Sequence, residues 1–181
     1  PVVGTNPFAL AVPDGAGGVR LVVDQSASVV AKSEVMQRVR AGAPIPEGWV
    51  LDAEGRPTTD GEAGLAGSMA PAGGHKGVGI GLMVELFAAA MTGAELGIDA
   101  APFSGTKGGP PQTGQFFLAV APDATSGGAF DARVSRLVEA IEAQPDARVP
   151  GRRRLAARAE ADAHGVAVDA ALLARIEALT G

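Results

Sequence analysis

With 181 residues, of which 46% are hydrophobic and 19% charged, the chain is long enough to form one globular domain, or a domain and a half, with a sizeable core. Its net charge of −5 argues against a general nucleic-acid binder, because such proteins neutralise phosphates with excess Lys and Arg. It contains no cysteine, which excludes disulfides, thiolate catalysis and cysteine-based zinc sites, and is compatible with the cytoplasmic location that we expect.

The start of the chain predicts two strands and a helix. The apolar residues 8–12 lie between prolines, the turn PDGAGG follows, and VRLVVD continues as a second strand, so a hairpin is the simplest arrangement. Valines at helical spacing then predict a helix that begins at Ser26 or Ser28 and stops at Gly42.

The middle of the chain combines a long loop with an apolar helix. Residues 43–64 carry several turn signals and predict an irregular stretch that Trp49 anchors. Residues 73–94, GGHKGVGIGLMVELFAAAMTGA, open with five glycines and continue as a nearly unbroken apolar run. This run is too short to span a bilayer and contains Glu85, so we expect a buried core helix and no membrane contact.

The last third predicts a strand and two helices. Residues 115–122, QFFLAVAP, have the composition of a strand. An amphipathic helix follows, ended by ARVPGRRR, with an apolar stripe of Phe130, Val134, Leu137, Val138 and Ile141. Asp169 is the N-cap of a final helix, whose inward face we expect to be Leu172, Leu173, Ile176 and Leu179. Together these elements predict an α/β fold with a mixed sheet covered by helices.

The glycine-rich start of the apolar helix is a candidate anion site. Glycines allow close approach of the backbone to a ligand, and a helix N-terminus offers unpaired N–H groups and the positive end of the helix dipole. Lys76 adds a full positive charge there. The spacing matches neither the P-loop nor the Rossmann fingerprint, and the glycines are equally compatible with close packing of the helix on a sheet.

Other polar segments leave two interpretations open. Thr5 and Asn6 in GTNPF either bind a substrate or form a turn, and Asp24 either binds ribose hydroxyls or caps a helix. The segment RPTTD is a ligand site or a loop satisfied by its own side chains. The run Arg152–Arg154 meets a phosphate or lies on a solvated helix face.

In order and spacing, GTNPFALAVP, VVDQSASVVAKSEV, PIPEGWVLDAEGRPTTD, GGHKGVGIGLMVELFAAAMTGA and GQFFLAV resemble the type-2 malate/L-lactate dehydrogenase family, over about residues 1–155. The resemblance implies an α/β fold with a mixed, largely antiparallel sheet flanked by helices, which binds NAD or NADP without a Rossmann unit, usually as a homodimer. It implies hydride transfer between nicotinamide and C2 of a small 2-oxo or 2-hydroxy acid, or a related cyclic imine. We expect residues 1–155 to form the NAD(P)-binding domain and residues 156–181 a C-terminal helical segment.

The resemblance also assigns site residues. Thr5 lies in the GTNP motif near the substrate. Cofactor contacts are implied where the family has DMA, GGHKG and a PGE-like segment, which here correspond to Asp24, Gln25, Ser26, His75, Lys76, Pro150, Gly151 and Arg152. No metal is implied.

Some positions depart from the family pattern. DMATS is DQSAS here, GH before the FFLA segment is GQ with Gln115, and PGE is PGR with Arg152. These departures keep open an alternative, a non-catalytic dinucleotide- or anion-binding module. The family's catalytic histidine and substrate-binding arginine precede GTNP, and neither His75 nor His164 occupies that position. We therefore expect a fragment with no catalytic residue of its own, and a histidine upstream of Pro1.

Overall fold

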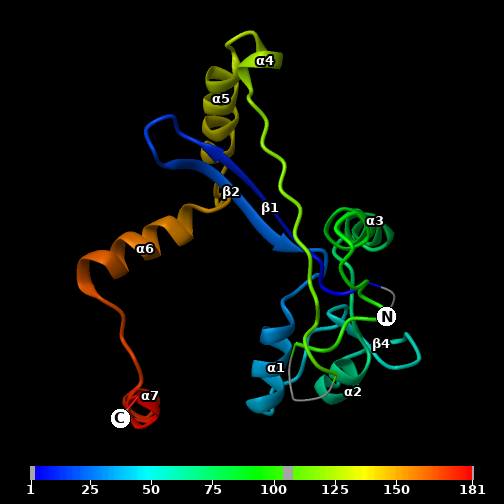
Figure 1. Ribbon diagram of the computed structural model, residues 1–181. Coiled ribbons are helices and arrows are strands. Elements are labelled where there is room, and N and C mark those ends of the chain that lie inside the picture. Colours follow the sequence, from blue (N-terminus) through cyan, green and yellow to red (C-terminus); the bar gives the residue numbers. More distant parts are fainter. Residues whose placement is uncertain (1–2, 104–107, 181) are drawn as a thin grey trace. The chain divides into compact units, whose positions relative to one another are not determined.

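The computed structural model describes residues 3–103 and 108–180, and its secondary structure is mixed α/β with small antiparallel sheets and helices (Figure 1). The chain divides into two compact units. The first unit comprises Pro1–Leu10 and Asp24–Thr125, and the second comprises Ala11–Val23 and Ser126–Gly181. Among the described residues, no helix combines the length and apolar character needed to cross a membrane.

The first two strands form the predicted hairpin. β1 (Pro7–Pro13) pairs with β2 (Val19–Ser26), and Figure 1 shows the two side by side. Asp14 shapes their connection, since its carboxylate accepts the N–H groups of Ala16 at 2.8 Å and Gly18 at 2.9 Å. These hydrogen bonds favour the ionised carboxylate and lower the pKa of Asp14 below its ordinary value.

The first helix begins later than predicted. α1 (Lys32–Arg40) is preceded by Ala31 as N-cap, so the predicted caps at Ser26 and Ser28 are wrong. The residues before Ala31 make hydrogen bonds to a distant segment, described below, and these bonds replace a helical start. The predicted stop at Gly42 is confirmed, because the helix ends at Arg40 and its C-cap, Ala41, directly precedes Gly42.

The predicted irregular stretch 43–64 is wrong in part, because it contains regular elements. β3 (Val50–Leu51), β4 (Pro57–Thr58) and β5 (Ser68–Met69) form an antiparallel sheet in the order β4-β3-β5. α2 (Gly61–Ala66) follows β4, and Asp60 caps it by accepting the N–H groups of Glu62 and Ala63. Strands of two residues are too short to show the alternation by which a strand is predicted.

The core of the first unit is formed by α1, α2 and this sheet. Val35, Ile45 and Val50 are fully buried, with further packing from Val30, Val39, Trp49, Leu65 and Met69. Trp49 is therefore an anchor, as predicted. The Arg38 guanidinium lies 4.9 Å from the centroid of its ring, in a cation–π contact.

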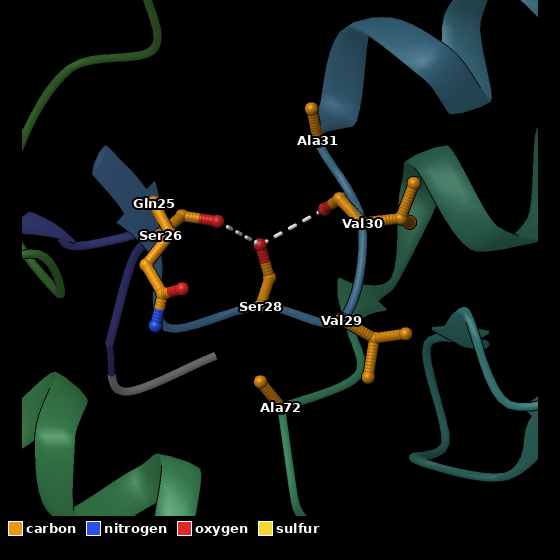
Figure 2. Close-up of a pocket in the computed structure, with 7 residues that line it drawn as sticks. All are labelled: Gln25, Ser26, Ser28, Val29, Val30, Ala31 and Ala72. Atoms are coloured by element: carbon orange, nitrogen blue, oxygen red, sulfur yellow. Dashed lines mark hydrogen bonds between the residues drawn. The ribbon is translucent and has the colours of Figure 1, made fainter. Parts of the chain in front are cut away.

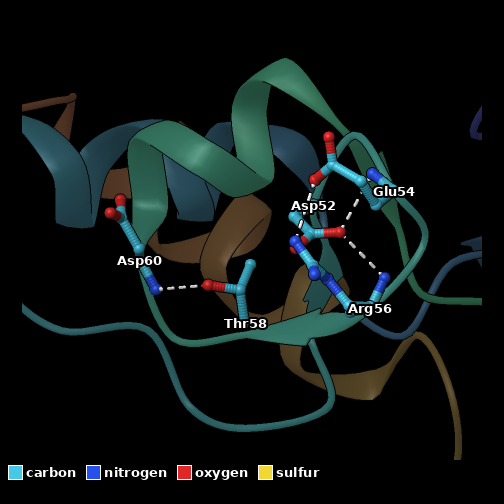
Figure 3. Close-up of polar contacts among 5 residues, drawn as sticks. All are labelled: Asp52, Glu54, Arg56, Thr58 and Asp60. Carbon is cyan, nitrogen blue, oxygen red and sulfur yellow. Dashed lines mark hydrogen bonds and ion pairs between the residues drawn. The ribbon is translucent and has the colours of Figure 1, made fainter.

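The turn between β3 and β4 satisfies its own polar groups (Figure 3). The Asp52 carboxylate accepts the backbone N–H groups of Arg56 at 2.9 Å and Glu54 at 3.0 Å, and the Arg56 guanidinium pairs with both carboxylates. The backbone hydrogen bond from Arg56 is the main cause that lowers the pKa of Asp52. Of the two interpretations of RPTTD, the structure favours the self-satisfied loop, in which Asp60 also donates its N–H to the Thr58 hydroxyl at 3.1 Å.

The apolar segment after GGHKG is a helix, as predicted, but it is not buried. α3 (His75–Val84) continues into the π-helical turn η1 (Glu85–Ala90). Its buried residues are small, namely Gly77, Gly81 and Ala89, whereas its large apolar side chains are exposed, with Leu86 at 62%. The exposed set is Val78, Ile80, Leu82, Met83, Leu86, Phe87 and Met91. Periodicity identifies an apolar helix, but it does not determine what covers each face.

Residues 115–122, all of which the structure describes, form no strand, so that prediction is wrong. The chain is apolar here, but it packs through one side chain rather than through a backbone ladder. Phe116 stacks on Phe87 with ring centroids 4.9 Å apart, while Phe117 is 84% exposed. α4 (Asp123–Ser126) follows.

The second unit is largely helical. α5 (Phe130–Glu142) confirms the predicted amphipathic helix, and Arg20 of β2 donates to the Ser135 hydroxyl on it at 2.8 Å. α6 (Arg152–His164) and α7 (Ala170–Thr180) complete the chain. Asp169 accepts the N–H of Leu172 at 3.0 Å, as its predicted capping role requires. The predicted inward face of α7 is wrong, because its members are exposed: Leu172, Leu173, Ile176 and Leu179.

Candidate functional site

Three of the sequence motifs meet in the first unit. The N–H of Ala27 is shared by the carbonyls of Thr5 and Asn6, at 2.9 and 3.3 Å, and the carbonyl of Ala27 accepts the N–H of Ala72 at 2.8 Å. The pairing continues with a Ser28–Pro71 bridge and a hydrogen bond from Val29 to Ala70. GTNP, DQSAS and the residues that lead into GGHKG therefore lie side by side. Thr5 is half-buried at this junction.

Asn6 fixes α3 to the GTNP segment. Its side chain is buried, and the amide nitrogen donates to the carbonyl of Gly81 at 2.8 Å and to a carboxylate oxygen of Glu85 at 2.9 Å. The other oxygen of Glu85 accepts the N–H of Gly97 at 3.0 Å. Sequence reasoning missed this contact. The signal was Glu85 itself, because a carboxylate within an apolar run needs a polar partner.

A pocket of about 330 Å³, open to solvent, lies at the end of β2 (Figure 2). Two predicted cofactor residues, Gln25 and Ser26, line it, and the exposed Asp24 precedes them on the strand. Sequence reasoning missed the other lining residues, which come from the segment after β2 and from its pairing partner: Ser28, Val29, Val30, Ala31 and Ala72. The Ser26 and Ser28 hydroxyl oxygens are 2.7 Å apart, and Ser28 donates to the carbonyl of Val30 at 2.9 Å.

The start of α3 follows directly from this pocket. The backbone leaves Ala72 through two glycines with positive φ and enters the helix at His75, so that His75 and Lys76 are exposed in the first turn. A side chain at Gly77 would collide with the carbonyl of Ala72, so close packing explains this glycine. It does not explain Gly79, around which a side chain would meet open space. The exposed lysine and the first N–H groups of α3 have the chemistry of an anion site.

The third predicted cofactor segment lies in the second unit. The carbonyl of Pro150 accepts the N–H of Val22 on β2 at 3.2 Å. Gly151 has a φ of 90°, and an added Cβ would lie 3.0 Å from the Val22 Cβ, so only glycine suits this position. Arg152 pairs with Glu142 at 3.1 Å in an exposed ion pair. A cofactor contact for these three residues stays a prediction.

Comparison with known proteins identifies the class. Residues 1–177 match the sequence pattern of the malate/L-lactate dehydrogenase family, and the chain belongs to this family. It is 47% identical over 160 residues to the (2R)-3-sulfolactate dehydrogenase (NADP(+)) of Chromohalobacter salexigens, covering 88% of this chain and 47% of that protein. It is 42% identical over 183 residues to the Delta(1)-pyrroline-2-carboxylate reductase of Agrobacterium fabrum, covering 99% and 52%.

A solved structure has a similar fold. The delta1-piperideine-2-carboxylate reductase of Pseudomonas syringae superposes with a TM-score of 0.81 at 36% identity, over 97% of this chain and 53% of that one. The chain thus spans about half the length of the relatives it matches.

Proposed function

We propose that the protein is an NAD(P)-dependent oxidoreductase that transfers a hydride between nicotinamide and C2 of a small carboxylate-bearing substrate. One observation carries this proposal. In a chain of the malate/L-lactate dehydrogenase family, GTNP, DQSAS and the approach to GGHKG are hydrogen-bonded to one another beside a single pocket. The absence of both standard nucleotide-binding fingerprints and the small antiparallel sheets support a non-Rossmann mode of cofactor binding.

The names of the relatives narrow the substrate class. Sulfolactate carries a hydroxyl on the carbon next to its carboxylate, and pyrroline-2-carboxylate carries a C=N bond at the same carbon. The shared chemistry is a carbon beside a carboxylate that gains or loses hydride. A 2-oxo or 2-hydroxy acid, as in malate/L-lactate dehydrogenases, or the corresponding cyclic imine fits this description.

The residues of the first unit suit a dinucleotide. The nicotinamide cofactor supplies the redox chemistry when bound, while protein groups position it and stabilise charge. Lys76, with the first N–H groups of α3, would hold phosphate, and His75 beside it would line the same approach. Asp24, Gln25 and Ser26 would meet neutral polar groups at the pocket, and Thr5 would lie near the substrate. For Pro150, Gly151 and Arg152, a cofactor contact is implied by the family resemblance alone.

Lys32 is our candidate for the additional phosphate of NADP. It is the first residue of α1 and directly follows the pocket-lining Ala31. Two other basic residues, Arg56 and Arg152, already pair with carboxylates. A relative whose name specifies NADP(+) supports NADP over NAD.

We also propose that the protein is a cytoplasmic homodimer. Sedimentation of the full-length protein tests the dimer.

The alternative is a non-catalytic dinucleotide- or anion-binding module, which Gln115 and Arg152 favour as departures from the family pattern. The test uses the full-length protein with NADPH or NADH and a panel of 2-oxo acids and Δ1-pyrroline-2-carboxylate. Cofactor oxidation that depends on substrate supports the enzyme. Saturable dinucleotide binding without turnover supports the module, and the absence of binding contradicts both.

A further inference from the structure

Two hydroxyl groups and a backbone carbonyl form a hydrogen-bonded chain in the pocket. The direction of each hydrogen bond in this chain, which we call the proton order, follows from the carbonyl at its end. The Ser28 hydroxyl has one proton, and the carbonyl of Val30, 2.9 Å away, can only accept. The Ser28 hydroxyl therefore donates its hydrogen bond to the Val30 carbonyl. The 2.7 Å contact between the two serines must then be a hydrogen bond donated by Ser26 and accepted by Ser28. Figure 2 shows the two dashed contacts in sequence, from Ser26 to Ser28 to Val30.

This order determines what Ser26 offers to a ligand. With its proton directed at Ser28, the Ser26 oxygen has only its lone pairs left for the pocket that it lines. We propose that Ser28 is a positioning residue that makes Ser26 an obligate hydrogen-bond acceptor, so that the pocket selects a ligand N–H or O–H group. An anionic oxygen of a phosphate or carboxylate would meet lone pair against lone pair at this point.

The inference rests on the proposed function and refines it. The end of β2 presents an acceptor, the Ser26 oxygen, whereas the start of α3 presents N–H groups and Lys76. A nicotinamide dinucleotide has matching groups, namely donors on the carboxamide and the ribose, and acceptors on the phosphates. Its carboxamide NH2 or a ribose hydroxyl would therefore face Ser26, with the phosphates toward α3.

A double-mutant cycle in the full-length protein tests whether Ser28 acts through Ser26. Ser28→Ala should weaken NADPH binding roughly 2- to 12-fold, the range for one neutral hydrogen bond, and Ser28→Thr should restore it because threonine keeps the hydroxyl. In a Ser26→Ala background, Ser28→Ala should have no further effect. Ser33→Ala, a serine lost from the exposed side of α1, is the matched control. Equal effects of Ser28→Ala in both backgrounds would overturn the inference.

Cofactor analogues identify the donor. Reduced 3-acetylpyridine adenine dinucleotide phosphate has a methyl group in place of the carboxamide nitrogen, and a 2′-deoxy analogue lacks a hydroxyl on the nicotinamide ribose. The wild-type protein should bind one of these less tightly than NADPH, and Ser26→Ala and Ser28→Ala should both reduce that preference. If neither analogue is discriminated, or if the variants keep the full preference, Ser26 is not selecting a donor and the inference fails.

One measurement needs no cofactor and separates this inference from the proposed function. The 13C chemical shift of the Val30 carbonyl should change in Ser28→Ala and stay in place in Ser26→Ala, because Ser28, and not Ser26, donates to that carbonyl. A Val30 signal that ignores Ser28→Ala would show that the proton order is wrong, even if dinucleotide binds. A wild-type protein that binds no dinucleotide would overturn the proposed function and the donor selection together. The proton order would still be tested by the chemical shift of the Val30 carbonyl.

Discussion

Asn6 and Glu85 show how a few polar atoms hold the site together. The Glu85 carboxylate binds the Asn6 amide through one oxygen and the Gly97 N–H through the other. Asn6 has a φ of 42°, a left-handed conformation that asparagine adopts more readily than most residues. The residue is therefore suited to this position by both its backbone and its side chain, and it connects GTNP to the helix that carries Lys76.

Replacing Asn6 should destabilise the protein through the lost donors. Asn6→Ala removes one hydrogen bond from the Gly81 carbonyl and one from the Glu85 carboxylate, a loss of about 1–3 kcal/mol. The two acceptors keep the backbone N–H groups of Glu85 and Gly97, respectively. Asp146→Ala is the control for backbone strain, since Asp146 is exposed and has a φ of 61°. Urea unfolding measures both. Equal losses for the two variants would mean that strain, rather than hydrogen bonding, explains the role of Asn6.

Two lysines are expected to bind different phosphates of the cofactor. Lys76→Ala should weaken the binding of NADH and NADPH alike by about 1–3 kcal/mol, the range for a charge-assisted hydrogen bond, and the loss should shrink at high salt. Lys32→Ala should weaken NADPH binding and leave NADH unchanged. Titration calorimetry on both variants checks this. An unchanged affinity in folded Lys76→Ala would remove this lysine from the site.

At the scale of elements, the helix around residue 35 shows why its start could not be predicted. The valine spacing correctly indicated α1, but residues 27–29 pair with residues 70–72 instead of extending it. That pairing joins segments more than 40 residues apart, and no local pattern encodes it. The motifs of the site were identifiable from sequence, whereas Ser28, Val30 and Ala72 became visible only through this pairing.

Two glycines of α3 provide a test of packing against propensity. Gly77→Ala should destabilise the protein by about 1–3 kcal/mol, because the new methyl group would collide with the Ala72 carbonyl beside the pocket. Gly79→Ala, in open space on the same helix, should stabilise it by roughly 0.5–1 kcal/mol through reduced backbone entropy of the unfolded chain. Thermal unfolding of both variants measures the two changes in stability. A stabilised Gly77→Ala would mean that α3 does not pack closely on Ala72.

The β3–β4 turn should respond to acid. The folded-state pKa of Asp52 lies below its unfolded value, so its stabilising contribution is complete above about pH 4 and is lost as the pH falls through the lower folded pKa. Asp52→Asn should therefore lower the unfolding midpoint at neutral pH, and the difference from wild type should diminish in acid. Asp99→Asn, at an exposed carboxylate, is the control. A difference that is constant with pH would contradict the role of this carboxylate.

At the scale of the whole molecule, sequence identified which segments are apolar but not which are covered. The helix after GGHKG and the last helix were expected to bury apolar side chains, yet Leu86 and Leu179 are exposed. Residues 115–122 were expected to form a strand and form none, and Phe117 is exposed. Burial depends on partners from distant parts of a protein, and periodicity within one segment carries no information about them. The order of the motifs, by contrast, is a property of the sequence alone, and the family prediction made from it is confirmed.

Dinucleotide binding should stabilise the full-length protein by mass action. Since a ligand that binds only the folded state adds RT ln(1 + [L]/Kd), NADPH at 100 times its Kd should raise the free energy of unfolding by about 2.7 kcal/mol. Thermal unfolding with and without NADPH measures this shift, and AMP at the same concentration is the control. Equal shifts with NADPH and AMP would point to recognition of the adenine half alone.

The peptide groups of Ala27 have a consequence for how the chain opens. The N–H of this residue donates to the carbonyls of Thr5 and Asn6, and its carbonyl accepts the N–H of Ala72, so a single residue links two outer segments. Neither outer segment can detach without exposing backbone groups of Ala27 to water. We therefore expect local unfolding here to be cooperative, with amide hydrogen exchange at Ala27 and Ala72 occurring in one shared event.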